Sequence, residues 1–163
     1  MACATDRVGV GPMAAVAGTM AQLAAIAGIK AGADEAIVEN GGDIYLQAKE
    51  PVVIELFAGS DTLPRRLGFS LMPENTPTAI CSSSGKMGHS TSLGQCDLAT
   101  VVSKDAALAD AAATQAANLV RIHEDVESTL NRIAAIEGID GVLIVKEAHI
   151  GMAGKLPPLV KIR

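Results

Sequence analysis

Three polar side chains at four-residue spacing give the clearest chemical signal in the sequence. Asp110, Thr114 and Asn118 interrupt a run that is otherwise mostly alanine and leucine. On a helix this spacing stacks all three on one face. A carboxylate, a hydroxyl and an amide are hard oxygen donors, which Mg²⁺ accepts together with phosphate and water. The column therefore fits a metal site, although the solvated face of an ordinary helix shows the same pattern.

A second group of polar residues lies between two short apolar runs. Asn40-Gly41-Gly42-Asp43 separates Ala36–Val38 from Ile44–Leu46. Asn and Gly tolerate positive φ, so the pattern predicts a β-hairpin with a tight turn. Its bare backbone amides and the carboxylates of Glu39 and Asp43 suit a polar ligand at close range. A tight turn without any ligand needs the same residues.

A hydroxyl-rich segment, Ser82–Ser92, is the third candidate. Its first residues, Ser83, Ser84 and Gly85, can offer hydroxyls and backbone amides to a phosphate. The segment is not a Walker A motif, because the required glycine and the following Ser or Thr are missing. His89 is the one histidine set among polar loop residues and is a candidate acid or base. A solvated loop with a bystander histidine is the alternative.

Composition narrows the class of partner. The 163-residue chain has a formal net charge of −5, and Arg65-Arg66 is its largest basic cluster. It contains no Trp, one Tyr and two Phe, so it offers few aromatic platforms for single-stranded nucleic acid. We therefore expect neither nucleic acid nor an anionic membrane as a partner. The oligomeric state, including a homo-oligomer, stays open.

The cysteines indicate a reducing compartment. Cys3, Cys81 and Cys96 are odd in number and lack CxxC spacing, so we expect reduced thiols in a cytoplasmic protein. A reactive thiol needs an electropositive and partly exposed environment, for which the sequence gives no sign.

The first long apolar stretch, Val8–Ile29, is rich in Ala and Gly and interrupted by Pro12 and Gln22. These features favour a buried helix over a membrane span or a signal peptide. Pro12 suits the first turn, and Gly28 or Gly32 can end the helix. We expect its large apolar residues to be buried against a sheet; they are Met13, Val16, Met20 and Leu23. Another face carries only small residues, which are Ala14, Gly18, Ala21 and Ala25.

Strand patterns dominate the middle of the chain and helical patterns follow them. The predicted strands are 35–39, 44–48, 51–57, 67–72, 78–81, 97–102, 142–145 and 159–162. An alanine-rich helix is expected from a cap at Ser103 or Asp105 to Arg121. A second helical pattern begins at Ile122 and stops at Gly138, and together the two patterns form either one kinked helix or two separate helices. Strands gathered before helices indicate an α+β fold in a single domain, residues 1–163.

In this order the motifs resemble those of the ApbE superfamily, the flavin transferases. The family pieces are a Gly-Gly-Asp hairpin, a strand ending in Thr-Ser-Gly, a short His segment and an Ala-Asp-Ala-Leu-Ala-Thr helix. The resemblance spans about residues 8 to 145 and is strongest to the uncharacterised ApbE-related branch. The matching pieces here are Val10–Gly18, Val38-Glu-Asn-Gly-Gly-Asp-Ile44, Thr78-Ala-Ile-Cys-Ser-Ser-Ser84, Gly88-His89-Ser90 and Ala109-Asp-Ala-Ala-Ala-Thr114.

The resemblance implies an ApbE-like fold, in which a mixed or antiparallel sheet packs with a buried small-residue helix and C-terminal helices. By residue match it implies Mg²⁺ at Asp110 and Thr114, and His89 near a transferred phosphate. It further implies FAD or another nucleotide-like small molecule as the ligand, and an enzyme related to FAD:protein FMN transferases.

The chain departs from the transferase pattern in three places. Val16-Ala-Gly-Thr19 stands where transferases have Ala-Lys-Gly-Tyr, and Ser90–Gly94 replaces an Asp-Pro-x-Thr-Gly motif. The upstream segment that supplies flavin contacts is absent, so the domain is expected to lack an N-terminal portion. Two alternatives to a transferase follow. One is a ligand-binding protein without catalysis. The other is an accessory protein of anaerobic sulfur assimilation toward homocysteine, using Cys81 or Cys96.

Overall fold

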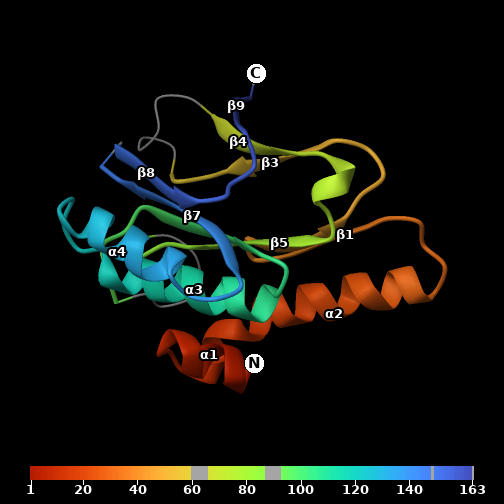
Figure 1. Cartoon of the computed structure of the whole chain (residues 1–163), viewed down its shortest axis with the longest axis horizontal. Helices are drawn as coiled ribbons and strands as arrows, with labels where there is room; N and C mark the ends of the chain where they lie inside the picture. Colours follow the sequence, from red (N-terminus) through yellow and green to blue (C-terminus); the bar gives the residue numbers. More distant parts are fainter. Residues whose placement is uncertain (60–65, 87–92, 148, 163) are drawn as a thin grey trace.

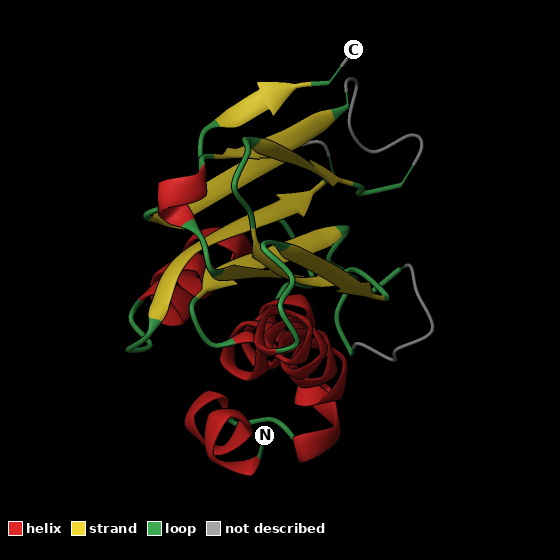
Figure 2. Ribbon diagram, turned by 90° about the vertical axis from the view of Figure 1, so that its right-hand side faces the viewer, coloured by secondary structure: helices red, strands yellow, loops and turns green. Residues whose placement is uncertain are grey.

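The chain folds into three stacked layers (Figure 1). In this computed structural model, which describes residues 1–59, 66–86, 93–147 and 149–162, helices cover one face of a six-stranded sheet. A three-stranded sheet covers the other face, as the turned view in Figure 2 shows. The helices are α1 (Ala2–Val8), α2 (Val16–Lys30), α3 (Ala106–Leu119) and α4 (Asp125–Ala134), and the 3₁₀ turns are η1 (Pro12–Ala15) and η2 (Pro73–Asn75).

Both sheets are antiparallel throughout. The central sheet has the order β1-β2-β5-β6-β7-β8, and the smaller sheet has the order β3-β4-β9. The predicted α+β class is therefore confirmed. The strands are β1 (Ala36–Asn40), β2 (Asp43–Gln47), β3 (Val52–Leu56), β4 (Leu67–Leu71), β5 (Thr78–Ser83), β6 (Leu98–Ser103), β7 (Ile139–Lys146), β8 (His149–Gly154) and β9 (Leu159–Lys161).

The predicted hairpin forms at the edge of the central sheet. β1 and β2 pair from Ala36 opposite Gln47 to Asn40 opposite Asp43, so the turn consists of Gly41 and Gly42. Both glycines have positive φ, 66° and 100°, a backbone conformation that residues with a Cβ rarely adopt. The turn chemistry therefore accounts for both glycines without a ligand, and it leaves Asp43 as the first residue of β2.

Helix α3 is the most deeply buried of the described helices. Its first eight residues, Ala106 to Ala113, are all buried, and six of them are alanines. Small side chains let the helix lie close to β5 and β6, which it crosses on the helical face of the central sheet. Asp105 caps it, because its Oδ1 accepts from the backbone N–H of Ala107 at 2.9 Å. Packing therefore fixes the position of α3 and of its buried side chains.

The expected burial of the large apolar stripe on α2 is wrong. Met13 in η1 is 80% exposed, and Met20 and Leu23 are 56% and 58% exposed. The small face is buried instead, at Gly18, Ala21 and Ala25. The reason is close packing on α3: only small residues let the two helix backbones approach, so the larger side chains point outward. Pro12–Lys30 is also long and apolar enough to span a membrane, by length and composition only.

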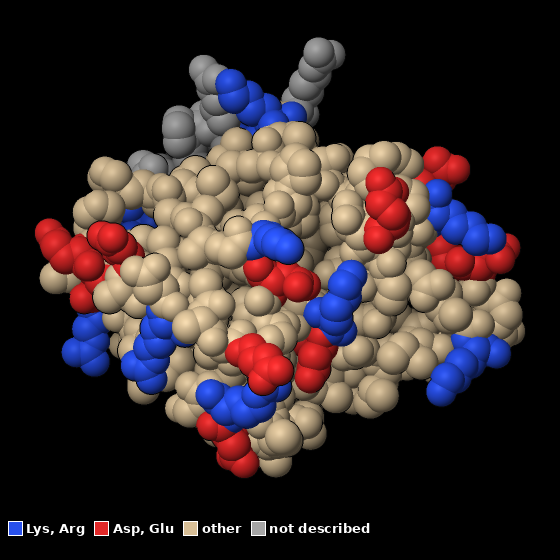
Figure 3. All heavy atoms as spheres, viewed as in Figure 1, with Lys and Arg blue, Asp and Glu red and all other residues tan. Residues whose placement is uncertain are grey.

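The C-terminal helical region is two helices rather than one. α3 ends at Leu119 because Val120 is extended, and α4 starts at Asp125. Two elements, α1 and β8, were not predicted from the sequence. Acidic and basic side chains are interspersed over the face in Figure 3, without a large basic patch on that face.

The contact between α2 and α3 makes a test of the fold. A Cβ at Gly18 would lie 2.6 Å from the Ala106 carbonyl oxygen and 2.9 Å from Asp110 Cβ, so Gly18→Ala must push the helices apart. We expect it to lower the free energy of unfolding by about 1–3 kcal/mol. Gly28→Ala is the matched control on the same helix, because nothing lies within 4 Å of its Cβ position. Gly28→Ala should raise the free energy of unfolding by about 0.5–1 kcal/mol. Urea unfolding measures the stability of both variants, and equal stability of the two would contradict the close packing of α2 on α3.

Candidate functional site

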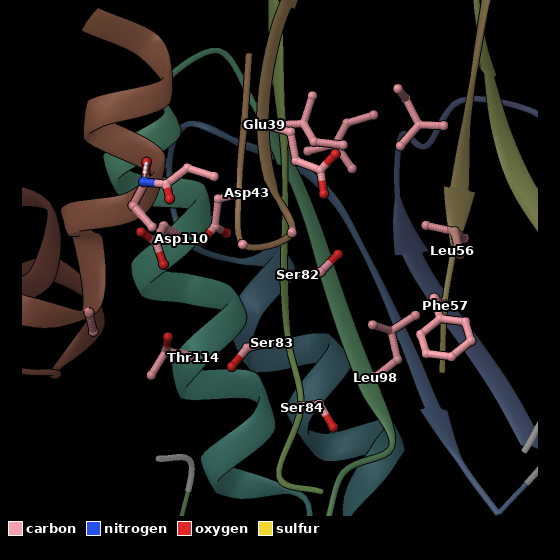
Figure 4. A pocket seen from close by; sticks show the side chains of 18 of the residues that line it. Glu39, Asp43, Leu56, Phe57, Ser82, Ser83, Ser84, Leu98, Asp110 and Thr114 are labelled. Carbon is pink, nitrogen blue, oxygen red and sulfur yellow. Dashed lines mark hydrogen bonds between the residues drawn. The ribbon is translucent and has the colours of Figure 1, made fainter. Parts of the chain in front are cut away.

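A cleft opens where the β1–β2 hairpin, the start of α2, the middle of α3 and the end of β3 come together (Figure 4). It encloses about 710 Å³, within the usual range for small-molecule sites. One wall is polar and comes from the hairpin turn, the end of β5 and one face of α3. The opposite wall is apolar, and Figure 4 shows Leu56, Phe57 and Leu98 across from the carboxylates. The cleft therefore suits a ligand with one polar and one apolar end.

Asp110 lies at the polar end and is held by the first turn of α2. The backbone N–H of Gly18 donates to its Oδ2 at 2.8 Å, and Ala17 makes a second backbone hydrogen bond. The side chain is only 7% exposed, and burial raises its pKa to about 6 although both N–H groups favour the charged form. The free N–H groups of a helix start attract negative charge. Asp110 thus caps α2 and lines the cleft at the same time.

Asp43 lies beside Asp110 at the same end of the cleft (Figure 4). It is equally buried, and its Oδ1 has no hydrogen-bond partner within the described part of the chain. Burial first, and then the charge of Asp110, raises the pKa of Asp43 to about 7. Hydrogen bonds from the Cys81 thiol and the Ser82 backbone oppose this shift. Two neighbouring buried carboxylates, one with a bare oxygen, need a proton or a cation between them.

The predicted column on α3 divides into two parts. Asp110 and Thr114 both line the cleft. Asn118, one turn further, does not; its Oδ1 accepts from the backbone N–H of Leu93 at 2.7 Å. Asn118 therefore anchors the chain where it returns to β6, while the other two side chains remain available to a ligand.

The hydroxyls at the end of β5 form the lower part of the polar wall. Ser82, Ser83 and Ser84 all line the cleft. The Ser82 hydroxyl is 2.9 Å from Thr100 Oγ1, and Ser84 Oγ accepts from the backbone N–H of Lys86 at 3.0 Å. These contacts hold the side chains in place before any ligand arrives.

Most of the residues that sequence reasoning selected come together here. The cleft is lined by Asn40, Gly41, Gly42, Asp43, Ser83, Ser84, Asp110 and Thr114. Gly85 is not among the lining residues; it packs on the chain opposite, where a Cβ would lie 2.4 Å from the Gly94 carbonyl oxygen. His89 lies outside the described residues, so its proposed role stays a prediction.

Sequence reasoning missed the apolar wall and the importance of Gly18. Ile54 and Leu56 lie on β3 of the smaller sheet and Phe57 directly follows it, and a strand pattern carries no sign of which sheet will lie over the site. Gly18 was noted as one of several small residues. Its role as the donor to Asp110 depends on how α2 crosses α3, which is a tertiary feature.

The site fits a hard divalent cation by its donor types. Asp43, Asp110 and Thr114 offer two carboxylates and one hydroxyl, the oxygen ligands that Mg²⁺ prefers alongside phosphate and water. Across residues 1–59, 66–86, 93–147 and 149–162, no three His, Cys, Asp or Glu side chains gather into a metal cluster. The protein would therefore supply only part of the coordination shell, which is usual for Mg²⁺ held together with a phosphate ligand.

Comparison with known proteins gives consistent matches over most of the chain. The family model described as "AbpE bacteria" matches residues 1–145. The UPF0280 protein of Methanococcoides burtonii is 43% identical over 162 residues, which cover 99% of this chain and 68% of that protein. The UPF0280 protein of Methanosarcina barkeri is 43% identical, with 99% of this chain and 64% of that protein covered. The chain spans about two thirds of the length of these curated relatives.

Solved structures share the fold at lower sequence identity. The apo flavinyl transferase ApbE of Pseudomonas stutzeri is 20% identical with a TM-score of 0.56, over 84% of this chain and 48% of that chain. The flavin transferase ApbE of Vibrio cholerae is 20% identical with a TM-score of 0.57, over 84% and 47%. At this identity the likeness shows the fold alone, and the chain spans about half of each of these structures.

The carboxylate pair makes stability depend on pH. Because the folded pKa of Asp43 is about 7 against 3.8 for the free group, the folded state binds more protons than the unfolded state between these values. The free energy of unfolding must then fall as pH rises from 4 to 7, and the loss of stability is complete above pH 7. At about 1.4 kcal/mol per pKa unit, this loss is on the order of 4 kcal/mol.

We expect the metal-free protein, kept in chelator, to lose stability between pH 5 and pH 8. Asp43→Asn removes one of the charges, so it should be less pH-dependent and more stable than the unmodified protein at pH 8. Thermal unfolding at the two pH values measures both effects. A protein that is equally stable at pH 5 and pH 8, with no gain from Asp43→Asn, would show that the carboxylates are not a repelling pair.

Proposed function

The chain belongs to the family described as "AbpE bacteria", and from this premise we propose that its cleft binds a flavin nucleotide together with a divalent cation. The proposed cation ligands are Asp43, Asp110 and Thr114, and Mg²⁺ is the proposed cation. The flavin assignment rests on the solved neighbours, which are described as flavin transferases. The proposal for the cation rests on this chain's own donors.

One observation carries the proposal: the buried Oδ1 of Asp43 has no hydrogen-bond partner among the residues that the structure describes. An ionised carboxylate on a side chain that is only 7% exposed, as Asp43 is, is unfavourable unless a positive group balances it. In the described part of the chain no Lys or Arg pairs with Asp43 or Asp110. A cation that accompanies the ligand would balance both charges at once.

The remaining polar wall is suited to the phosphates of a nucleotide. Gly41 and Gly42 leave the backbone of the turn bare toward the cleft, so an anionic group can approach it closely. The hydroxyls of Ser83 and Ser84 lie on the same wall. A divalent cation would neutralise a pyrophosphate here, and the turn and the serines would orient it. Leu56, Phe57 and Leu98 would exclude water from the apolar end of the ligand.

Phosphoryl transfer needs more than this set of groups. The acceptor's proton must be taken by a base, for which His89 remains the candidate. Thr19, in the segment where transferases carry Ala-Lys-Gly-Tyr, donates its hydroxyl to the Ala15 carbonyl oxygen at 2.5 Å, so it serves helix α2 rather than the cleft. We therefore expect ligand binding by this chain and little or no FMN transfer.

Thiol chemistry has less support than nucleotide binding. Cys81 and Cys96 are both fully buried, and burial raises the pKa of each, that of Cys96 to about 12. Neither side chain supplies a thiolate near neutral pH. The two buried thiols therefore give no support to a role in sulfur assimilation.

Binding is tested with two variants of the cation site. Thr114→Val keeps the shape of a half-buried side chain and removes a ligand, so it should weaken Mn²⁺ binding about tenfold. Asp110→Asn removes one negative charge and should abolish Mn²⁺ binding at micromolar concentrations of the cation. Asp34→Asn changes net charge equally but lies at an exposed ion pair with Lys49, and it should bind as the unmodified protein does. Calorimetric titration measures all four proteins, and FAD affinity should rise when Mg²⁺ is present. Wild-type affinity in both site variants would contradict the site.

Transfer is tested separately from binding. The protein is incubated with FAD, Mg²⁺ and a flavinylatable acceptor protein, and covalent FMN on the acceptor is measured by in-gel fluorescence. We expect no labelling above a no-enzyme control. Strong labelling that is lost in Asp110→Asn would show that this chain is a transferase despite its departures.

A further inference from the structure

The cleft bends round the hairpin edge of the central sheet, so its two ends lie on opposite faces of that sheet. Asp43 is paired with Cys81, whose side chain belongs to the core beneath α3, so Asp43 faces the helices. Glu39 is paired with Ile44, whose side chain packs toward the smaller sheet, so Glu39 faces that sheet. Figure 4 shows the same division, with Asp110 on one side of the hairpin and Glu39 on the other. A ligand that fills the whole cleft must therefore pass the two-glycine turn.

The end of the cleft that faces the smaller sheet is a slot between two apolar walls. The central sheet provides one wall, and β3 with the residue after it provides the other. The side chains that line the slot are Ile44, Ile80, Leu98, Ile54, Leu56 and Phe57. Phe57 is 63% exposed, so its ring is accessible to a ligand in the cleft. Two such walls suit a flat apolar group, and an aromatic ring between them stacks on Phe57.

Glu39 lies on the hairpin side of this slot without a partner of its own (Figure 4). Its side chain lines the cleft, and among the described residues it has neither a hydrogen bond nor an ion pair. Glu55, the other carboxylate that lines this end, accepts two hydrogen bonds of 2.6 Å from Arg66. Of these two carboxylates, Glu39 is therefore the one available to a ligand.

We propose that Glu39 is a specificity-determining residue: it accepts a hydrogen bond from an amino group on a ring bound in the slot, so that the cleft selects an aminopurine nucleotide. This rests on the proposed function, because it names the ring that accompanies the cation and the phosphates in that same cleft. In FAD the ring in the slot is then adenine, and the pyrophosphate crosses the two-glycine turn toward the cation.

The chemistry of a carboxylate discriminates between the two ring systems of FAD. An ionised carboxylate only accepts hydrogen bonds, and the amino group of adenine is a donor. The polar edge of the flavin ring carries one N–H between two carbonyl oxygens, which a carboxylate repels. The opposite edge of the flavin ring carries only methyl groups. Glu39 therefore favours adenine over the flavin ring in the slot.

Two nucleotides that differ at the group facing Glu39 test this assignment. Inosine diphosphate has a carbonyl oxygen where adenosine diphosphate has the amino group. With Mn²⁺ present, calorimetry should show that the unmodified protein binds adenosine diphosphate about tenfold more tightly than inosine diphosphate. Glu39→Gln should bring the two affinities within about threefold, because an amide both donates and accepts. Glu124→Gln is the matched control: it makes the same change of charge at an exposed residue outside the cleft, and it should keep the tenfold preference.

Inorganic pyrophosphate with Mn²⁺ separates the slot from the cation site, because it keeps the phosphate contacts and has no ring. Glu39→Gln and Phe57→Ala should bind this probe within about threefold of the unmodified protein. Phe57→Ala should bind adenosine diphosphate about tenfold more weakly, because the ring loses its stacking partner.

The role of Glu39 is overturned if the unmodified protein binds the two nucleotides equally, or if the preference survives in Glu39→Gln. Adenosine diphosphate that binds no more tightly than pyrophosphate also overturns it. FMN binding that weakens in both Glu39→Gln and Phe57→Ala would place the flavin ring in the slot instead of adenine, and would overturn the selection of an aminopurine. An unmodified protein that binds neither Mn²⁺ nor pyrophosphate with Mn²⁺ overturns the proposed function instead.

Discussion

The contact between the Gly18 backbone and the Asp110 carboxylate holds the structure and the candidate site together. At 2.8 Å it ties the first turn of α2 to the middle of α3, and it fixes the side chain that lies at the polar end of the cleft. The tie is reciprocal, because Gln22 on α2 accepts from the backbone N–H of Ala106 at the first turn of α3. Each helix thus caps the other, so neither can shift without exposing unpaired N–H groups.

This mutual capping has a consequence for electrostatics. The same carboxylate that stabilises α2 lies beside a second carboxylate, Asp43, in a site shielded from water. The fold therefore keeps two like charges close together at a cost to its own stability. A cation bound with an anionic ligand relieves that cost, so ligand binding and folding stability are linked by mass action.

Local patterns predicted much of the fold. The Asn-Gly-Gly-Asp turn fixed the hairpin because only a few residue types accept positive φ, and alternating apolar residues marked most strands. The ApbE superfamily resemblance is confirmed by the family match and the shared fold. The burial of α2 was predicted on the wrong face. Hydrophobic periodicity shows that a helix has an apolar stripe, but close helix packing selected the small residues, and this choice depends on the partner helix.

The candidate site shows the same limit. Spacing placed Asp110 and Thr114 on one face, and it included Asn118, which instead anchors the chain at Leu93. Leu56 and Phe57 of the apolar wall come from β3 of the smaller sheet and the residue after it, and no local pattern encodes the position of that sheet over the hairpin. The sequence therefore indicated which residue types could bind a ligand, but not how elements far apart in the chain would be arranged around them.

The central claim is that Asp43, Asp110 and Thr114 hold one divalent cation. A crystal grown or soaked with Mn²⁺ and a flavin nucleotide, with anomalous diffraction recorded at the manganese edge, tests it most directly. The account predicts a single strong anomalous peak within about 2.0–2.4 Å of Asp43 Oδ1, with Asp110 and Thr114 in the same coordination shell and a ligand phosphate opposite. A peak elsewhere on the molecule, or a flavin bound in the cleft with no peak beside Asp43, would contradict it.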